Sequence, residues 1–187
     1  TKKWRPKNAS ISEKEFEWRL IDLDLTGASI SPERVRYEEP LTDIGYTNFY
    51  HAHCPDGVVG VATYGKVTIS DIYPGIDWVV MSRPGEAVHH DFIVNPGADL
   101  SQIRMEYKGA DTIDISDDGR RLRIRTELGD VQEGALHIYQ GDEANVIDGR
   151  FDVEGNIVRF DVDDYDRSLP LTIDPPLVWS TYYGGSN

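Results

Sequence analysis

Two histidine-containing stretches carry the residue types best suited to binding a transition metal. In "HAHC", His51 and His53 are two residues apart, so a β-strand would place both imidazoles on one face. Zinc and copper are bound by such imidazoles together with thiolates. The same alternation points Cys54 to the opposite face and separates His89 from His90. The spacing therefore disfavours a shared centre, and we predict no transition-metal site at these residues.

Carboxylates are the second group with potential chemistry, because the chain has 33 Asp and Glu against 19 Lys and Arg. Calcium prefers clustered oxygen ligands, and the runs "DLDL" (22–25), "SDDG" (116–119) and "DVDDYD" (161–166) supply them. None of these runs has the spacing of an EF-hand loop, and alternating aspartates on a strand form a solvated face. We therefore predict no cofactor, with calcium at 161–166 as the one alternative left open.

The sequence lacks the motifs that mark common catalytic sites. It has no G-x-S-x-G elbow, P-loop, Rossmann fingerprint or H-E-x-x-H pair. Nothing selects two of its acids as the pair that glycoside hydrolysis needs. We predict no catalytic, cofactor-binding or metal-binding residues, and a protein that is not an enzyme. A hydrolase remains the remote third alternative, and it would require a concave pocket with convergent polar groups.

Bulk composition narrows the class of protein further. A formal net charge of −14 argues against nucleic acid as a partner, because a phosphate backbone requires a surface rich in Lys and Arg. No apolar run approaches the ~20 residues of a membrane-spanning helix. With one cysteine among 187 residues, an intramolecular disulfide framework is excluded.

The elements that must position these groups follow from a hydrophobic period of two. Stretches such as "IRMEYKG", "RLRIRTEL" and "IVRFDVD" alternate apolar and polar side chains, as half-buried antiparallel strands do. Turn residues fall between them every 8–12 residues. We predict an all-β fold, an antiparallel β-sandwich or two small packed sheets, with little helix. The residues expected to be buried are Met105, Tyr107, Leu122, Ile124, Phe160 and Val162, and those expected to be exposed are Arg104, Arg123 and Arg159.

Local turn chemistry makes more specific predictions. Gly119 in "SDDGR" and the glycine of "VEGN" (153–156) suit hairpin turns that need a positive φ. In "YPGID", Pro74 and Gly75 suit a type II turn, with Asp77 accepting backbone hydrogen bonds. The best helical candidate is a short turn at 12–18.

Four longer motifs occur in order from about Tyr46 onward: "TNFYHAHCPDG", "KVTISDIYPGIDWVV", "HHDFIVNPGADLSQIRMEYKGAD" and "LPLTIDPPLVWSTYYGGS". On them, the chain resembles the β-rich domain of unknown function that precedes SBBP (seven-bladed β-propeller) repeats in large exported bacterial proteins. Many of those proteins use type IX secretion. The resemblance implies an extracellular or cell-surface location and a downstream propeller in the same polypeptide. It carries over no catalytic residue.

The expected domain organisation follows from the turn signals and the resemblance. We predict an N-terminal tail or linker at 1–15 and an all-β domain at 16–176, with a weak signal for a subdivision near 95–100. Pro175 and Pro176 lack ladder donors, so the sheet cannot run straight through them. The strand beyond them resembles the start of the first SBBP repeat, so residues 177–187 are predicted to begin a following propeller.

The predicted function is a non-catalytic, extracellular or cell-surface structural or interaction module. Its partners would be the downstream propeller and a surface protein or glycan. The alternative is a carbohydrate-binding or adhesin module, which would use exposed, coplanar tryptophans as stacking platforms. The candidates for that role are Trp4, Trp18, Trp78 and Trp179. Buried Trp is the commoner fate in a β core.

Overall fold

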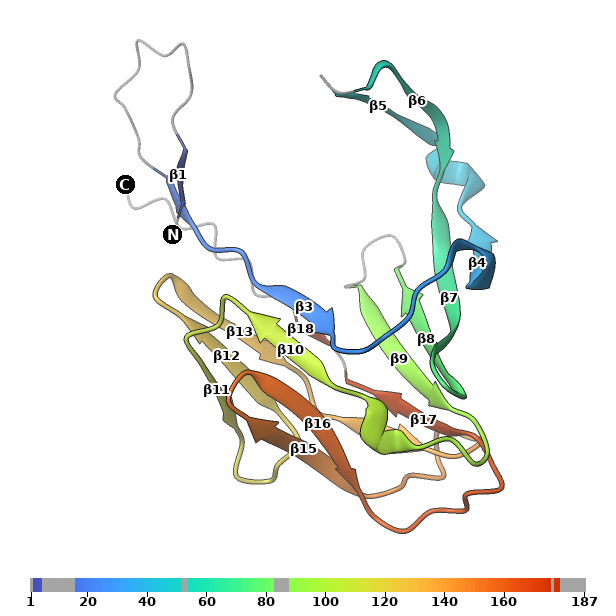
Figure 1. The fold of residues 1–187 in the computed structure, drawn as a ribbon, viewed down its shortest axis with the longest axis vertical. Helices are drawn as coiled ribbons and strands as arrows, with labels where there is room; N and C mark the ends of the chain where they lie inside the picture. The colour runs from blue at the N-terminus through green and yellow to red at the C-terminus, as the bar shows by residue number, and fades with distance from the viewer. Residues whose placement is uncertain (1, 5–15, 52–53, 83–87, 176, 179–187) are drawn as a thin grey trace.

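The structure is a computed structural model that describes residues 2–4, 16–51, 54–82, 88–175 and 177–178 (Figure 1). Within these ranges the regular elements are antiparallel strands and three short 3-10 helices, which confirms the all-β prediction. The helices are η1 (Pro32–Arg34), η2 (Thr42–Ile44) and η3 (Leu100–Gln102). None of the helices in the described ranges has the length and apolar character needed to cross a membrane.

The largest sheet has six strands in the order β14-β17-β9-β8-β7-β4. Its strands are β4 (Val35–Pro40), β7 (Tyr64–Tyr73), β8 (Ile76–Met81), β9 (His89–Val94), β14 (His137–Tyr139) and β17 (Leu171–Asp174). The last of these in sequence, β17, lies between β9 and β14, with Ile173 paired to Phe92 and Ile138. Strands far apart in the sequence therefore complete this sheet.

Two four-stranded sheets face the large one. The first has the order β15-β16-β10-β3, and the second has the order β11-β12-β13-β18. Their strands are β3 (Asp22–Leu25), β10 (Met105–Lys108), β11 (Thr112–Ile115), β12 (Leu122–Thr126), β13 (Gly129–Glu133), β15 (Gly149–Glu154), β16 (Ile157–Val162) and β18 (Leu177–Val178). The turn at 95–99 and η3 connect β9 of the large sheet to β10.

A single hydrophobic core joins the three sheets. Phe92 of β9 meets Phe160 of β16 at a ring-centroid distance of 5.9 Å, and Phe160 meets Phe151 at 5.7 Å. Leu122 and Ile124 of β12 belong to the same cluster. The strand-face prediction is confirmed for Met105, Tyr107, Leu122, Ile124 and Phe160, which are buried, and for Arg123, which is exposed. It is wrong in degree for Val162, Arg104 and Arg159, which are all intermediate.

The predicted turns are present. Gly119 joins β11 to β12 and Gly155 joins β15 to β16, with φ of 73° and 62°. Between β7 and β8, Gly75 has φ of 74°, and Asp77 accepts a hydrogen bond of 2.8 Å from the backbone N–H of Asp71. The helical turn expected at 12–18 is wrong at its described end, because Phe16–Trp18 forms β2, which pairs with β1 (Lys2–Trp4).

β5 (Tyr46–His51) and β6 (Cys54–Ala62) form a two-stranded hairpin, named here the β5–β6 arm. Only Thr63 separates β6 from β7, so β6 extends directly from the β7 strand of the large sheet. Figure 1 shows the arm standing away from the packed sheets, at the upper right. Its strands hydrogen-bond only to each other in the sheet order of the described residues.

A glycine after β10 allows the first segment of the chain to approach it closely. Gly109 has φ of +92°, and a Cβ there would lie 2.3 Å from the carbonyl oxygen of Leu20. Arg19 Nε also donates to the Gly109 carbonyl at 2.9 Å, which holds the two segments together. The backbone of residues 19–21 can therefore lie against this position only while it is glycine.

Gly109→Ala should destabilise the protein more than a matched turn substitution. Gly155 also has a positive φ, +62°, but open space surrounds its missing Cβ. Alanine costs ~1–2 kcal/mol at either site through its backbone conformation. At Gly109 the clash adds at least ~1 kcal/mol. Urea denaturation of both variants measures the difference, and equal losses would contradict the close approach.

Candidate functional site

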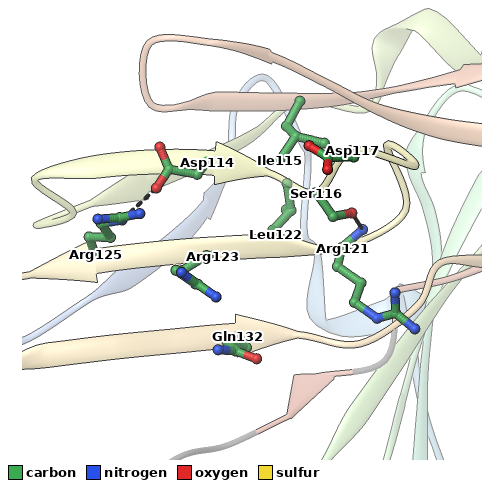
Figure 2. Close-up of a pocket in the computed structure, with 9 residues that line it drawn as sticks. All are labelled: Asp114, Ile115, Ser116, Asp117, Arg121, Leu122, Arg123, Arg125 and Gln132. Carbon is green, nitrogen blue, oxygen red and sulfur yellow. Dashed lines mark hydrogen bonds and ion pairs between the residues drawn. The ribbon is translucent and has the colours of Figure 1, made fainter.

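A shallow pocket lies on the outer face of β11, β12 and β13 (Figure 2), with a volume of about 380 Å³. Most of its lining residues are polar side chains that alternate outward from these strands, and Ile115 and Leu122 complete the lining. Arg125 Nε contacts Asp114 Oδ2 at 2.5 Å, and Arg123 Nε lies 3.9 Å from Asp130 Oδ2. These groups are about half exposed, so each pair contributes at most ~1 kcal/mol. The pocket holds mutually paired, solvated charges, as expected for the polar face of a sheet.

A second pocket, of about 350 Å³, is lined in part by residues 161–165 of the aspartate run that was left open as a calcium site. Asp161 forms an ion pair with Arg150. Asp166 caps a turn by accepting from the Ser168 backbone N–H at 2.9 Å. Arg167 lies over the Tyr165 ring, 5.7 Å from its centroid. These three side chains therefore already have partners within the protein.

One aspartate in each of the other two runs also has a partner within the protein. Asp24 contacts Lys108 Nζ at 2.5 Å, and Asp118 accepts from the Arg120 backbone N–H at 3.1 Å. Partners of this kind hold the pKa of the Asp118 carboxyl below its usual range, with the Ser116 hydroxyl as the largest cause. Among the residues that the structure describes, no three His, Cys, Asp or Glu side chains are grouped so as to hold a metal ion.

The histidine pair at 89–90 is divided between the two faces of β9, as the alternation predicted. His90 is buried, with Trp78 at 5.8 Å and Phe92 at 5.6 Å between ring centroids. Burial, and secondarily the nearby His89, lowers the pKa of His90 to about 4, so its imidazole is neutral at physiological pH. Cys54 is a free, partly exposed thiol. The His51 side chain and His53 lie outside the described residues.

Purified protein is expected to contain no stoichiometric zinc or copper. The reason is the divided geometry of His89 and His90 together with the opposite direction predicted for Cys54. Elemental analysis by mass spectrometry, combined with thermal melting in the presence and absence of a chelator, tests the expectation. About one zinc per chain, with a melting temperature that falls on chelation, would show a folding-linked metal site that the alternation argument missed.

A pair of carboxyls on the outer face of the large sheet escaped sequence analysis. The register pairs Ile173 with Phe92, which brings the next residues, Asp174 and Asp91, side by side on the opposite face. The pKa of Asp91 is raised to about 6, first by burial and next by the neighbouring Asp174. Burial also raises the pKa of Asp174. Finding this pair requires knowing that β17 lies next to β9, which no local pattern reveals.

A second group that sequence analysis missed lies inside the core. Glu133, at the end of β13, is only 1% exposed, and its Oε1 accepts a hydrogen bond from the Tyr107 hydroxyl of β10. Its Oε2 is enclosed and has no hydrogen-bond partner among the described residues. Burial raises the pKa of Glu133 to about 7 against the lowering effect of the Tyr107 hydrogen bond. The alternation of β13 could have signalled an inward-facing Glu133.

The β5–β6 arm carries a group of exposed apolar side chains on both of its faces. Tyr46 is 70% exposed, Tyr50 68% and Val59 62%. Phe49 and Val58, which pair across the two strands, are also exposed. Exposed hydrophobic patches on a soluble protein mark surfaces that contact other molecules.

The tryptophans proposed as sugar-stacking residues do not form a common platform in the described part of the chain. Trp18 is exposed on β2, whereas Trp78 packs against the hydrophobic core from β8. The Trp4 side chain and Trp179 lie outside the described residues. Exposed aromatics are instead found on and beside the arm, at Tyr37, Tyr46, Phe49 and Tyr50.

Comparison with known proteins gives one match. A family model described as a domain of unknown function, DUF7948, matches residues 1–176. No curated protein and no solved structure matches the chain significantly.

Proposed function

The chain belongs to the DUF7948 family, whose function is unknown. We propose that it is a non-catalytic structural and interaction module of a larger exported bacterial protein. The module would lie outside the cell or on its surface and precede a propeller of SBBP repeats. The four ordered motifs from Tyr46 onward support this context. The interaction role is supported by the β5–β6 arm.

The arm carries the proposal because it is unlike the rest of the surface. A two-stranded hairpin alone is marginally stable in water, and this one exposes apolar side chains on both faces. Residues 46–64 contain one formally charged side chain, Asp56, in a chain of net charge −14. Such a surface is best stabilised by packing against another folded unit, which would bury Tyr46, Phe49 and Val59.

The path of the chain near its C-terminus supports a role in holding a following propeller in a defined orientation. β17 ends at Asp174, and after Pro175 the chain resumes as β18, which pairs with β13 through Leu177–Glu133 and Val178–Gln132. A segment that follows Val178 would therefore leave from a sheet edge with a fixed direction. A flexible linker would leave that direction unset.

Amide exchange tests the proposal. We expect the backbone amides of residues 46–51 and 54–62 to gain at least tenfold protection when the 187-residue chain is compared with the longer exported polypeptide. The physical reason is burial of the arm against the following unit. Val59→Ser should reduce the gain, whereas Leu169→Ser, at an exposed position on the body, should not. Equal protection of the arm in both proteins would contradict the proposal.

Carbohydrate binding is the second candidate, and exposed tyrosines favour it. Tyr37 is 62% exposed and lies 5.2 Å from the Tyr64 ring, close to the base of the arm. Aromatic rings of this kind can stack on sugars. Isothermal titration with bacterial surface polysaccharides would show saturable binding that Tyr37→Ser removes. Binding that survives Tyr37→Ser and Tyr46→Ser would contradict this candidate.

A further inference from the structure

Glu133 occupies a buried position, where ionising its carboxyl carries a large desolvation free energy. Its side chain lies on the core face of its sheet, as do Leu122 and Ile124 of β12, each of which is 1% exposed. The hydroxyl of Tyr107, itself 2% exposed, donates to Oε1. Oε2 has no partner among the described residues, so a charge placed there would be uncompensated. A buried carboxylate with one hydrogen bond and no counter-ion is strongly disfavoured, whereas the neutral acid is tolerated.

Among the described residues, the strand positions paired with Glu133 are occupied by uncharged residues. Its strand neighbours are Leu122 on β12 and Leu177 on β18. The arginines at 123 and 125 of β12, and Arg121 just before it, alternate to the outer face, where they line the pocket of Figure 2. On β10, Tyr107 is the titratable group that faces Glu133, since Lys108 is exposed and paired with Asp24.

The cover over Glu133 is unequal on its two sides. β12 pairs with β13 over five residue pairs, from Leu122–Glu133 to Thr126–Gly129. β18 pairs with β13 over two, and Glu133–Leu177 is one of them. Opening β18 would bring water to the Glu133 carboxyl at the loss of a short edge pairing. Opening β12 would break the middle of the sheet.

We propose that Glu133 and Tyr107 form a proton-dependent clasp, which holds β18 on β13 while the Glu133 carboxyl is protonated and loosens it when the carboxyl ionises. The clasp would set how firmly the segment after Val178 is attached to this domain. It concerns contacts within the described residues, and so it does not depend on a propeller following. The pKa of about 7 places the change in the neutral range.

The sign of the effect follows from linkage. The pKa of Glu133 is raised by burial, so the closed state favours the protonated acid and is fully populated at low pH. As pH rises through about 7, the closed state loses this advantage and the open state, with a solvated carboxylate, gains population. β18 should therefore be firmly paired in mildly acidic solution and loosened in mildly alkaline solution.

The test is an NMR titration of the whole chain from pH 5 to 9. We expect the Glu133 side-chain carboxyl carbon to titrate near pH 7. The exchange protection factors of the Leu177 and Val178 amides should fall at least tenfold over the same range, and those of Leu122 and Ile124 should change much less. If the β18 protection factors stay constant while Glu133 titrates, the clasp is refuted. No variant is needed for this measurement.

Three variants separate the clasp from general loosening. Glu133→Gln keeps the shape without a charge, so the β18 protection factors should become independent of pH. Tyr107→Phe removes the one hydrogen bond that favours the ionised form, so the carboxyl midpoint should move to higher pH. Asp130→Asn, on the outer face of the same strand, should leave the wild-type behaviour unchanged. A tenfold fall that persists in Glu133→Gln would assign the pH effect to another group.

Discussion

Phe160→Ala is expected to lower the free energy of unfolding by about 3–5 kcal/mol. Phe160 lies on β16 at the contact between the sheets, where its ring meets Phe92 of the large sheet at 5.9 Å and Phe151 of β15 at 5.7 Å. Removing the ring leaves a cavity between two other phenylalanines, each of which is at most 2% exposed. Partial collapse of these neighbours would place the loss at the lower end of the range.

Denaturant unfolding followed by circular dichroism measures this loss. Asp161→Ala is the matched control, because Asp161 is the next residue on β16 and points outward to an ion pair with Arg150. An exposed pair of this kind contributes at most ~1 kcal/mol. If Phe160→Ala and Asp161→Ala cost the same, the ring does not bridge the sheets as the structure has it.

The pH dependence of stability should reveal two buried groups that act in opposite directions. The pKa of His90 is lowered from 6.5 to about 4, so its contribution is complete above pH 6.5 and is lost as pH falls toward 4. The pKa of Glu133 is raised from 4.5 to about 7, so its contribution is complete below pH 4.5 and is lost as pH rises toward 7. Each effect is on the order of 3 kcal/mol, at about 1.4 kcal/mol per pH unit. Between pH 4.5 and 6.5 the two slopes offset each other.

Single substitutions should expose each slope. In Glu133→Gln, the stability measured by urea unfolding should rise between pH 4.5 and 6.5, because the His90 effect is then less opposed. In His90→Phe it should fall over the same interval and continue to fall to pH 7. Asp91, whose pKa is raised to about 6, acts in the same direction as Glu133, but its partial exposure weakens the effect. Parallel pH profiles for both variants would contradict the burial of these groups.

The features predicted from the sequence, strand faces and hairpin turns, depend on residues that are close together along the chain. The alternation in β10, β12 and β16 gave the buried faces because one face of each strand meets the core. Glycines 119 and 155 marked their hairpins because these turns require a positive φ. The outward direction of the arginines at 121, 123 and 125 follows from the same period of two.

What sequence analysis missed depends on which strands become neighbours. The pair Asp91–Asp174, 83 residues apart in the chain, requires β9 and β17 to lie side by side. Glu133 meets Tyr107 only because β13 and β10, in different sheets, face one core. The exposure of the arm was missed because its apolar sequence resembles that of a buried strand. "VVGVA" in β6 is apolar enough to suggest a core strand, yet four of its five residues are exposed and Val61 is intermediate.

The position of β17 in the large sheet bears on how the protein folds during its synthesis. Residues 171–174 form the last strand of that sheet in sequence but lie inside it, between β9 and β14. Until they leave the ribosome, β14 has no strand to join and Phe92 and Ile138 lack their common neighbour Ile173. Closure of the core therefore waits for residues 171–174, with contacts of high sequence separation that form slowly. Before that point the unpaired strand edges and apolar faces stay exposed, and such exposure favours aggregation.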